Sequence, residues 1–132
     1  MFTYVQKYPK MLLNGRPILG APLYSGHGAG LNNPALEATP NIGPIPAGLW
    51  RIVQWFDTYE NKGPCVAQLD PVGWDALGRS GFLIHGVRVG DQNDSSDGCI
   101  CAGLAIRTAM RNSADMALTV ISGLDPVGGT IS

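Results

Sequence analysis

The sequence has little charge, no long hydrophobic run and few cysteines. Charged residues make up 14% of the 132 residues, and nine Lys and Arg against ten Asp and Glu leave a net charge of -1. The basic residues form no stripe of the kind that neutralises phosphates, so we expect no nucleic-acid partner. No apolar run approaches the roughly 20 residues that span a bilayer, so we expect no membrane insertion.

The N-terminal residues MFTYVQKYPK lack the basic-then-apolar pattern of a secretory signal peptide. If the chain acts outside the cytoplasm, we therefore expect it to be secreted without a signal peptide. The three cysteines are too few for a disulfide framework. Because their number is odd, at least one thiol is free or pairs between molecules.

Glycine, proline and hydrophobic residues are plentiful. The chain has 18 Gly, 10 Pro and 45% hydrophobic residues, which favours a compact, turn-rich fold that is mainly β and contains some helix. An all-helical or a disordered chain would not fit this composition. The length suits one ordinary domain with its own core, and no linker or charge block divides it. We expect a single domain over residues 1–132.

Turn signals separate several expected strands. Asn14-Gly15 predicts a two-residue hairpin turn between arms at Phe2–Leu13 and Arg16–Tyr24, because both central residues of that turn take positive φ. The stretch 25–46 is dense in Gly, Pro and Asn and predicts a long irregular loop. Further strands are expected at Gly48–Phe56, Cys65–Leu69, Phe82–His85 and Met116–Ser122.

One helix is expected after Cys101, beginning near Gly103, from the segment AGLAIRTAMRNS. Its spacing predicts one apolar face, with Arg107 and Arg111 on the other side or at its edge. The expected apolar face consists of Leu104, Ala105, Thr108, Ala109 and Met110.

The segment from His85 to Cys99 contains what a nucleophilic cysteine needs. Those needs are a base or cation that makes the thiolate, an accessible sulfur and donors for an oxyanion. His85, at the expected end of a strand, offers an imidazole to Cys99. Gly98 lets the amides of residues 97–99 converge on an oxyanion. A helix that followed at once would also place its positive end near the sulfur.

These motifs resemble the signature of the L,D-transpeptidase (YkuD-like) catalytic domains, which act on peptidoglycan stem peptides. The resemblance rests on His85-Gly86 at a strand end, a polar loop and the SDGCI segment that contains Cys99. Ser25-Gly26 and the GPIPAGLWRI segment at Gly43–Ile52 are similar to a small branch that includes type VI secretion effectors. The match runs in order over roughly Tyr4–Ile121.

The resemblance implies a YkuD-like β-sandwich or open barrel with one helix behind the cysteine loop, and a role for each matching residue. Cys99 is the nucleophile that attacks the meso-diaminopimelate carbonyl of a tetrapeptide stem and expels the terminal D-alanine. His85 is the proton shuttle, and the Gly86 carbonyl orients it. The amides of Gly98 and Cys99 are the oxyanion donors. Transfer of the acyl group to water gives an L,D-carboxypeptidase, and transfer to an amine gives an L,D-transpeptidase.

The chain departs from the family pattern at two positions next to the nucleophile. The family usually has His where Asp97 stands and Arg where Cys101 stands. Arg88 and Arg107 are therefore candidates for holding the stem carboxylate. The expected substrate-binding residues are Ser96, Asp97, Arg88 and His27.

The resemblance also implies partners and a place of action. The expected partners are peptidoglycan tetrapeptide stems, a secretion apparatus and a cognate immunity protein. The chain would act as an antibacterial toxin in the periplasm of target bacteria. We expect no cofactor and no metal ion.

Other interpretations stay open. Cys101 is expected to be a core cysteine, with a Cys65–Cys101 disulfide as the alternative. A zinc site at His85, Cys99 and Cys101 lacks a fourth ligand and has an unusual Cys-x-Cys spacing. The alternative functions are a papain-like peptidoglycan endopeptidase or amidase, which normally has its cysteine before its histidine, and a catalytically inactive wall-binding module.

Overall fold

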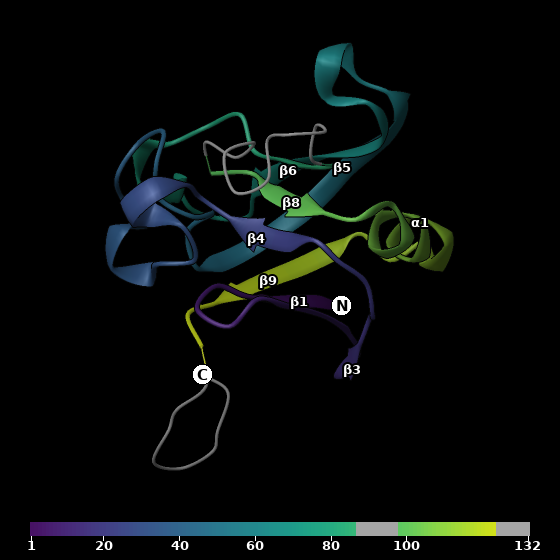
Figure 1. The fold of residues 1–132 in the computed structure, drawn as a ribbon, viewed down its shortest axis with the longest axis horizontal. Coiled ribbons are helices and arrows are strands. Elements are labelled where there is room, and N and C mark those ends of the chain that lie inside the picture. The colour runs from purple at the N-terminus through teal and green to yellow at the C-terminus, as the bar shows by residue number, and fades with distance from the viewer. Residues whose placement is uncertain (87–97, 124–132) are drawn as a thin grey trace.

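The computed structural model describes residues 1–86 and 98–123, which form one curled mixed sheet and one α-helix (Figure 1). Neighbouring strands follow the order β3-β2-β1-β9-β5-β6-β7-β8-β4. The sheet curls into a half-barrel, and the expected mainly β class with a single helix behind the cysteine loop is confirmed.

The strands are short except for the central pair. They are β1 (Phe2–Val5), β2 (Lys10–Leu13), β3 (Arg16–Pro17), β4 (Leu23–Ser25), β5 (Gly48–Thr58), β6 (Pro64–Pro71), β7 (Leu83–His85), β8 (Ile100–Ala102) and β9 (Ala117–Ile121). The helix α1 spans Leu104–Ser113. Four single 3-10 turns are η1 (Gly28–Gly30), η2 (Pro34–Leu36), η3 (Glu60–Lys62) and η4 (Ala76–Gly78).

The Asn-Gly turn lies where the sequence predicts it. Asn14 and Gly15 have φ values of 51° and 83°, and the turn pairs β2 with β3. The expected long arm at Phe2–Leu13 is wrong, because the chain already reverses between β1 and β2, which pair antiparallel. β1 also pairs in parallel with β9, so the first and last described strands lie side by side.

The core lies inside the curl of the sheet and draws on almost every strand. Trp50 is 2% exposed and contacts Trp74 and Phe82 edge to face, with ring centroids 5.7 Å and 4.9 Å away. Its indole N–H donates to the Pro46 carbonyl at 3.0 Å, so the only polar atom of this large side chain is satisfied. Other fully buried members of the cluster are Phe2, Tyr4, Ile45, Ile84, Ile100, Ile106, Met110 and Leu118.

The helix begins where the sequence predicts, but its buried face does not match. Gly103 is the residue before the first turn, as expected. The buried helical residues are Ile106, Arg107 and Met110, whereas Leu104 is 52% exposed. The expected face is wrong because the sequence predicts a solvated charge at Arg107. In the structure its guanidinium donates to backbone carbonyls inside the domain. Counting Arg107 as buried rotates the buried face away from Leu104.

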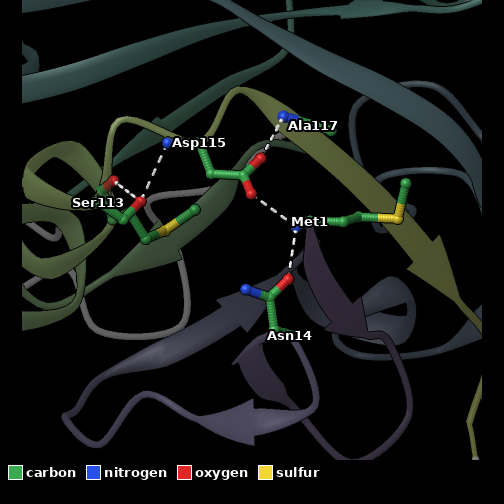
Figure 2. A network of polar contacts seen from close by, with 6 residues as sticks. Met1, Asn14, Ser113, Asp115 and Ala117 are labelled. Atoms are coloured by element: carbon green, nitrogen blue, oxygen red, sulfur yellow. Dashed lines mark hydrogen bonds and ion pairs between the residues drawn. The ribbon is translucent and has the colours of Figure 1, made fainter.

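A polar network joins the start of β1 to the junction between α1 and β9, as Figure 2 shows. The ammonium of Met1 donates to Asp115 at 2.6 Å and to Asn14 at 2.9 Å. Asp115 also accepts from the Ala117 amide at 3.0 Å, and the Ser113 hydroxyl accepts from the Asp115 amide at 3.2 Å. The hydrogen bond from the Met1 ammonium, followed by that from Ala117, holds the pKa of Asp115 below its ordinary value.

This network predicts a small, pH-dependent contribution to stability. Because the pKa of Asp115 is lowered on folding, its stabilising effect is present at neutral pH and is lost as the pH falls below about 4, where the unfolded carboxylate is protonated. Asp115→Ala should lower the free energy of unfolding at pH 7 by less than about 1 kcal/mol, since the group is near the surface. Urea unfolding at pH 7 and pH 3 measures this, and an equal loss at both pH values would contradict the account.

Candidate active site

The site is built on the parallel pairing of β7 and β8. This pairing aligns Ile84 with Ile100 and His85 with Cys101. Because side chains alternate along a strand and aligned residues share a face, the two isoleucines point into the core and His85 and Cys101 lie together on the other face. The Cys101 sulfur is 3.9 Å from Nδ1 and 4.0 Å from Nε2 of the imidazole.

Cys101 is fully buried, which confirms the expectation of a core cysteine. Cys65 carries a reduced thiol, so the alternative Cys65–Cys101 disulfide is not formed. Among residues 1–86 and 98–123, no group of three or more His, Cys, Asp or Glu side chains could hold a metal ion.

Cys99 comes immediately before β8 and is half-buried. Its sulfur accepts a hydrogen bond from the Leu83 amide at 3.3 Å and lies 3.7 Å from the Gly81 carbonyl. An N–H donor aimed at sulfur stabilises the anionic form, and a thiolate is the nucleophilic form of cysteine.

His85 and Cys99 line the same small pocket, whose volume is about 180 Å³. The structure therefore brings together the two residues that the sequence analysis singles out, although 13 residues separate them in the chain. The described residues that line the pocket are Asn41, Lys62, Ser80, Gly81, Phe82, Leu83, His85 and Cys99.

The orientation of His85 follows from its partner. The side chain is 2% exposed, and its Nδ1 lies 2.6 Å from the carbonyl oxygen of Gly86. A carbonyl only accepts, so Nδ1 carries the proton in this hydrogen bond and Nε2 keeps its lone pair. This tautomer suits a group that takes and returns a proton through Nε2.

Gly98 is required by a close approach of Arg79. A side-chain Cβ at Gly98, where φ is 127°, would lie 2.2 Å from the Arg79 guanidinium. The carbonyl of Gly98 accepts from the buried Ser25 hydroxyl at 3.1 Å, and that hydroxyl accepts from the Ile45 amide at 2.8 Å. Ser25, at the end of β4, and the loop that follows therefore hold the backbone next to Cys99.

Arg79 provides a cation beside Cys99, and the sequence does not predict this position for it. Its guanidinium donates to the carbonyls of Pro44 at 2.8 Å and Gly43 at 3.1 Å, and it lies over the Phe82 ring. Burial lowers the pKa of Arg79, while the negative charges of Cys99 and Glu37 oppose this shift. Arg79 belongs to no sequence motif. The only clue to it is the GPIP segment, whose carbonyls hold it.

Arg107 cannot serve as the carboxylate anchor considered above. It is 5% exposed and donates to the carbonyls of Ala102 at 2.8 Å, Cys65 at 3.2 Å and Pro64. A Cβ on Gly86 would lie 2.6 Å from this guanidinium. Arg107 therefore ties α1 to the start of β6 beneath the residue that orients His85.

The expected helix-dipole effect on Cys99 is also wrong. The strand β8 intervenes between Cys99 and the first helical residue, Leu104. Four extended residues span about 13 Å, and the field of a helix terminus falls off within about one turn. The missed element is only three residues long and carries no sequence signal of its own.

Of the expected substrate-binding residues, the structure describes only His27. Arg88, Ser96 and Asp97 lie outside the described residues. His27 precedes η1, where its amide donates to the Ile42 carbonyl at 3.0 Å, and it is not among the described residues that line the pocket around Cys99.

A family model described as the Tlde1 domain matches residues 20–121. The chain belongs to the Tlde1 domain family. Tlde1 proteins are L,D-transpeptidase-like effectors of type VI secretion. Membership of this family indicates a peptidoglycan-related activity and secretion into target cells. No curated protein matches the sequence. The Tlde1 match includes both β7 and β8. None of the described helices is long and apolar enough to cross a membrane.

The position of Arg79 predicts an effect on the reactivity of this Tlde1 domain. Arg79→Met removes a cation near Cys99 and should slow alkylation of Cys99 by iodoacetamide at pH 7 by several-fold, because less of the sulfur is thiolate. Arg51→Met is the matched control, since Arg51 is exposed and pairs only with Asp70, at 3.8 Å, among the described residues. An unchanged rate in a folded Arg79 variant would show that the cation does not act on the thiol.

Arg107 predicts a large effect on stability. Arg107→Met leaves buried carbonyls without their donor and should lower the free energy of unfolding by about 2–4 kcal/mol. Arg111→Met, one turn later, is the control. Arg111 pairs with exposed Asp57 at 2.9 Å, so this variant should stay close to the wild type. Urea unfolding compares the two variants, and equal losses would refute the structural role of Arg107.

Proposed function

We propose that this Tlde1 domain is a peptidoglycan L,D-carboxypeptidase and L,D-transpeptidase with Cys99 as its nucleophile. The observation that supports this best is the shared pocket of Cys99 and His85, with the Leu83 amide 3.3 Å from the sulfur. The substrate we propose is a tetrapeptide stem that ends in meso-diaminopimelate and D-alanine.

The first half-reaction moves the acyl group of the stem to sulfur. Nε2 of His85 takes the thiol proton of Cys99, and the thiolate attacks the meso-diaminopimelate carbonyl. The amides of Gly98 and Cys99 are our proposed donors to the oxyanion. When the carbon–nitrogen bond to D-alanine breaks, the proton on His85 passes to the leaving amine, and a thioester remains on Cys99.

The second half-reaction releases the stem. A water molecule or an amine attacks the thioester and gives a proton to His85, and the sulfur leaves as thiolate. Water yields a tripeptide stem, whereas an amine yields a new crosslink or an exchanged D-amino acid. The hydrogen bond between Nδ1 and the Gly86 carbonyl fixes the same Nε2 for both proton transfers.

The biological setting follows from the effector family. We propose that the domain reaches the periplasm of a neighbouring bacterium and trims or exchanges the stem ends there. A cognate immunity protein that covers the pocket around Cys99 would protect the producer. The coarser role, a type VI effector with peptidoglycan-related activity, is that of the Tlde1 family itself.

The proposal predicts one specific mass change. Purified protein incubated with disaccharide tetrapeptide should release one alanine, or exchange it for added D-methionine, as measured by mass spectrometry. Cys99→Ala should lower the rate by more than about a thousandfold, because the nucleophile is lost. Cys65→Ala is the control, since Cys65 is not among the described residues that line the pocket.

Two other outcomes would point to different functions. Cleavage elsewhere in the stem would favour a cysteine endopeptidase or amidase. Binding to peptidoglycan with no mass change in any sample would favour a wall-binding module.

A further inference from the structure

The described lining of the pocket around Cys99 carries a single positive charge. Of the described residues that line it, Lys62 is the only one with a permanent charge, and none is a carboxylate. The other described lining residues include the apolar side chains of Phe82 and Leu83 and the small polar side chains of Asn41 and Ser80. A positive charge in a confined pocket attracts an anionic ligand more strongly than the same charge in open water.

The backbone of Lys62 is held in place before any ligand binds. Lys62 ends η3, at the tip of the β5–β6 hairpin that projects from the body of the domain (Figure 1). Its amide donates to the Tyr59 carbonyl at 2.8 Å, and the Tyr59 amide donates to Gly63 at 3.2 Å. The Tyr59 ring contacts Phe56 edge to face at 4.9 Å. A fixed backbone reduces the entropy lost when the half-buried side chain engages a ligand.

Lys62 also differs from Arg79 and Arg107 in that no described residue binds its side-chain donors. The guanidinium groups of Arg79 and Arg107 each donate to backbone carbonyls. Lys62 forms no ion pair with any residue in the described ranges 1–86 and 98–123. An ammonium has three hydrogen-bond donors, and a carboxylate is its usual partner.

We propose that Lys62 is a specificity-determining residue that binds the free carboxylate of the substrate's C-terminal residue, next to the bond that Cys99 attacks. The reacting bond and the identity of the peptide rest on the proposed function. The cationic site itself rests on the pocket. A volume of about 180 Å³ equals roughly six water molecules, which is enough for one small terminal residue. Lys62 thus directs the enzyme to chain ends.

The first test removes the charge from each partner in turn. The substrates are the disaccharide tetrapeptide and the same compound with a C-terminal carboxamide, compared by kcat/KM for release of alanine or alaninamide. Wild type should prefer the carboxylate by roughly ten- to a hundredfold, the size expected for a charge-assisted hydrogen bond. Lys62→Met should lose this preference by slowing only the carboxylate substrate, and Lys62→Arg should retain most of it.

Exposed Lys10, on β2, provides the matched control variant, Lys10→Met. Equal slowing of both substrates in Lys62→Met would mean a structural role, and an unchanged preference would mean that Lys62 does not touch the carboxylate. Either result overturns the inference and leaves the proposed chemistry intact.

A second test needs no peptidoglycan activity. Iodoacetate and iodoacetamide both alkylate a thiolate with loss of iodide, and they differ in that only iodoacetate carries a carboxylate. The ratio of their rates at Cys99 should fall roughly fivefold in Lys62→Met and stay unchanged in Lys10→Met. An unchanged ratio in Lys62→Met would overturn the anion site. A lowered ratio in a protein that releases no alanine would uphold the site and refute only the proposed reaction.

Discussion

The parallel pairing of β7 with β8 is the constraint on which the site depends. It aligns two three-residue strands that lie far apart in the sequence, and its register puts His85 and Cys101 on one face and two isoleucines on the other. A shift of one residue would exchange the faces, turning the imidazole into the apolar core and the isoleucines away from it. The flanking strands β6 and β4 hold this short pair from both sides. The geometry of the candidate site is therefore fixed by the same contacts that fill the core.

Backbone carbonyls do much of the positioning around this pair. The loop between β4 and β5 offers carbonyls to Arg79, and Ser25 joins the same loop to the carbonyl of Gly98. On the opposite side, Arg107 collects carbonyls from β8 and from the start of β6. Each arginine satisfies several acceptors that would otherwise be costly to bury, and each lies against a glycine that leaves room for it. Half-buried Arg79 thus lies beside Gly98, the neighbour of Cys99, and buried Arg107 lies beside Gly86, the neighbour of His85.

The sequence predicts best what local chemistry determines. The Asn14-Gly15 turn, the strand ending at His85 and the start of the helix near Gly103 all follow from residue types at fixed offsets. The buried face of α1 does not, because Arg107 is buried through contacts with residues about 40 positions earlier in the chain. Arg79 and Lys62 escape detection for the same reason, since they join the site through tertiary contacts that leave no periodic trace. Strand β8 is too short to be distinguished from the loop before it.

The position of β9 has a consequence for how the sheet assembles during folding. This last described strand inserts between β1 and β5, in the interior of the sheet. Until β9 pairs with both β1 and β5, no described strand joins the hairpins of the first 17 residues to the half of the sheet that contains Cys99. Pairing between such distant segments makes folding slow. A chain in which β9 has not yet paired leaves the facing edges of β1 and β5 open, and open strand edges can pair with other chains.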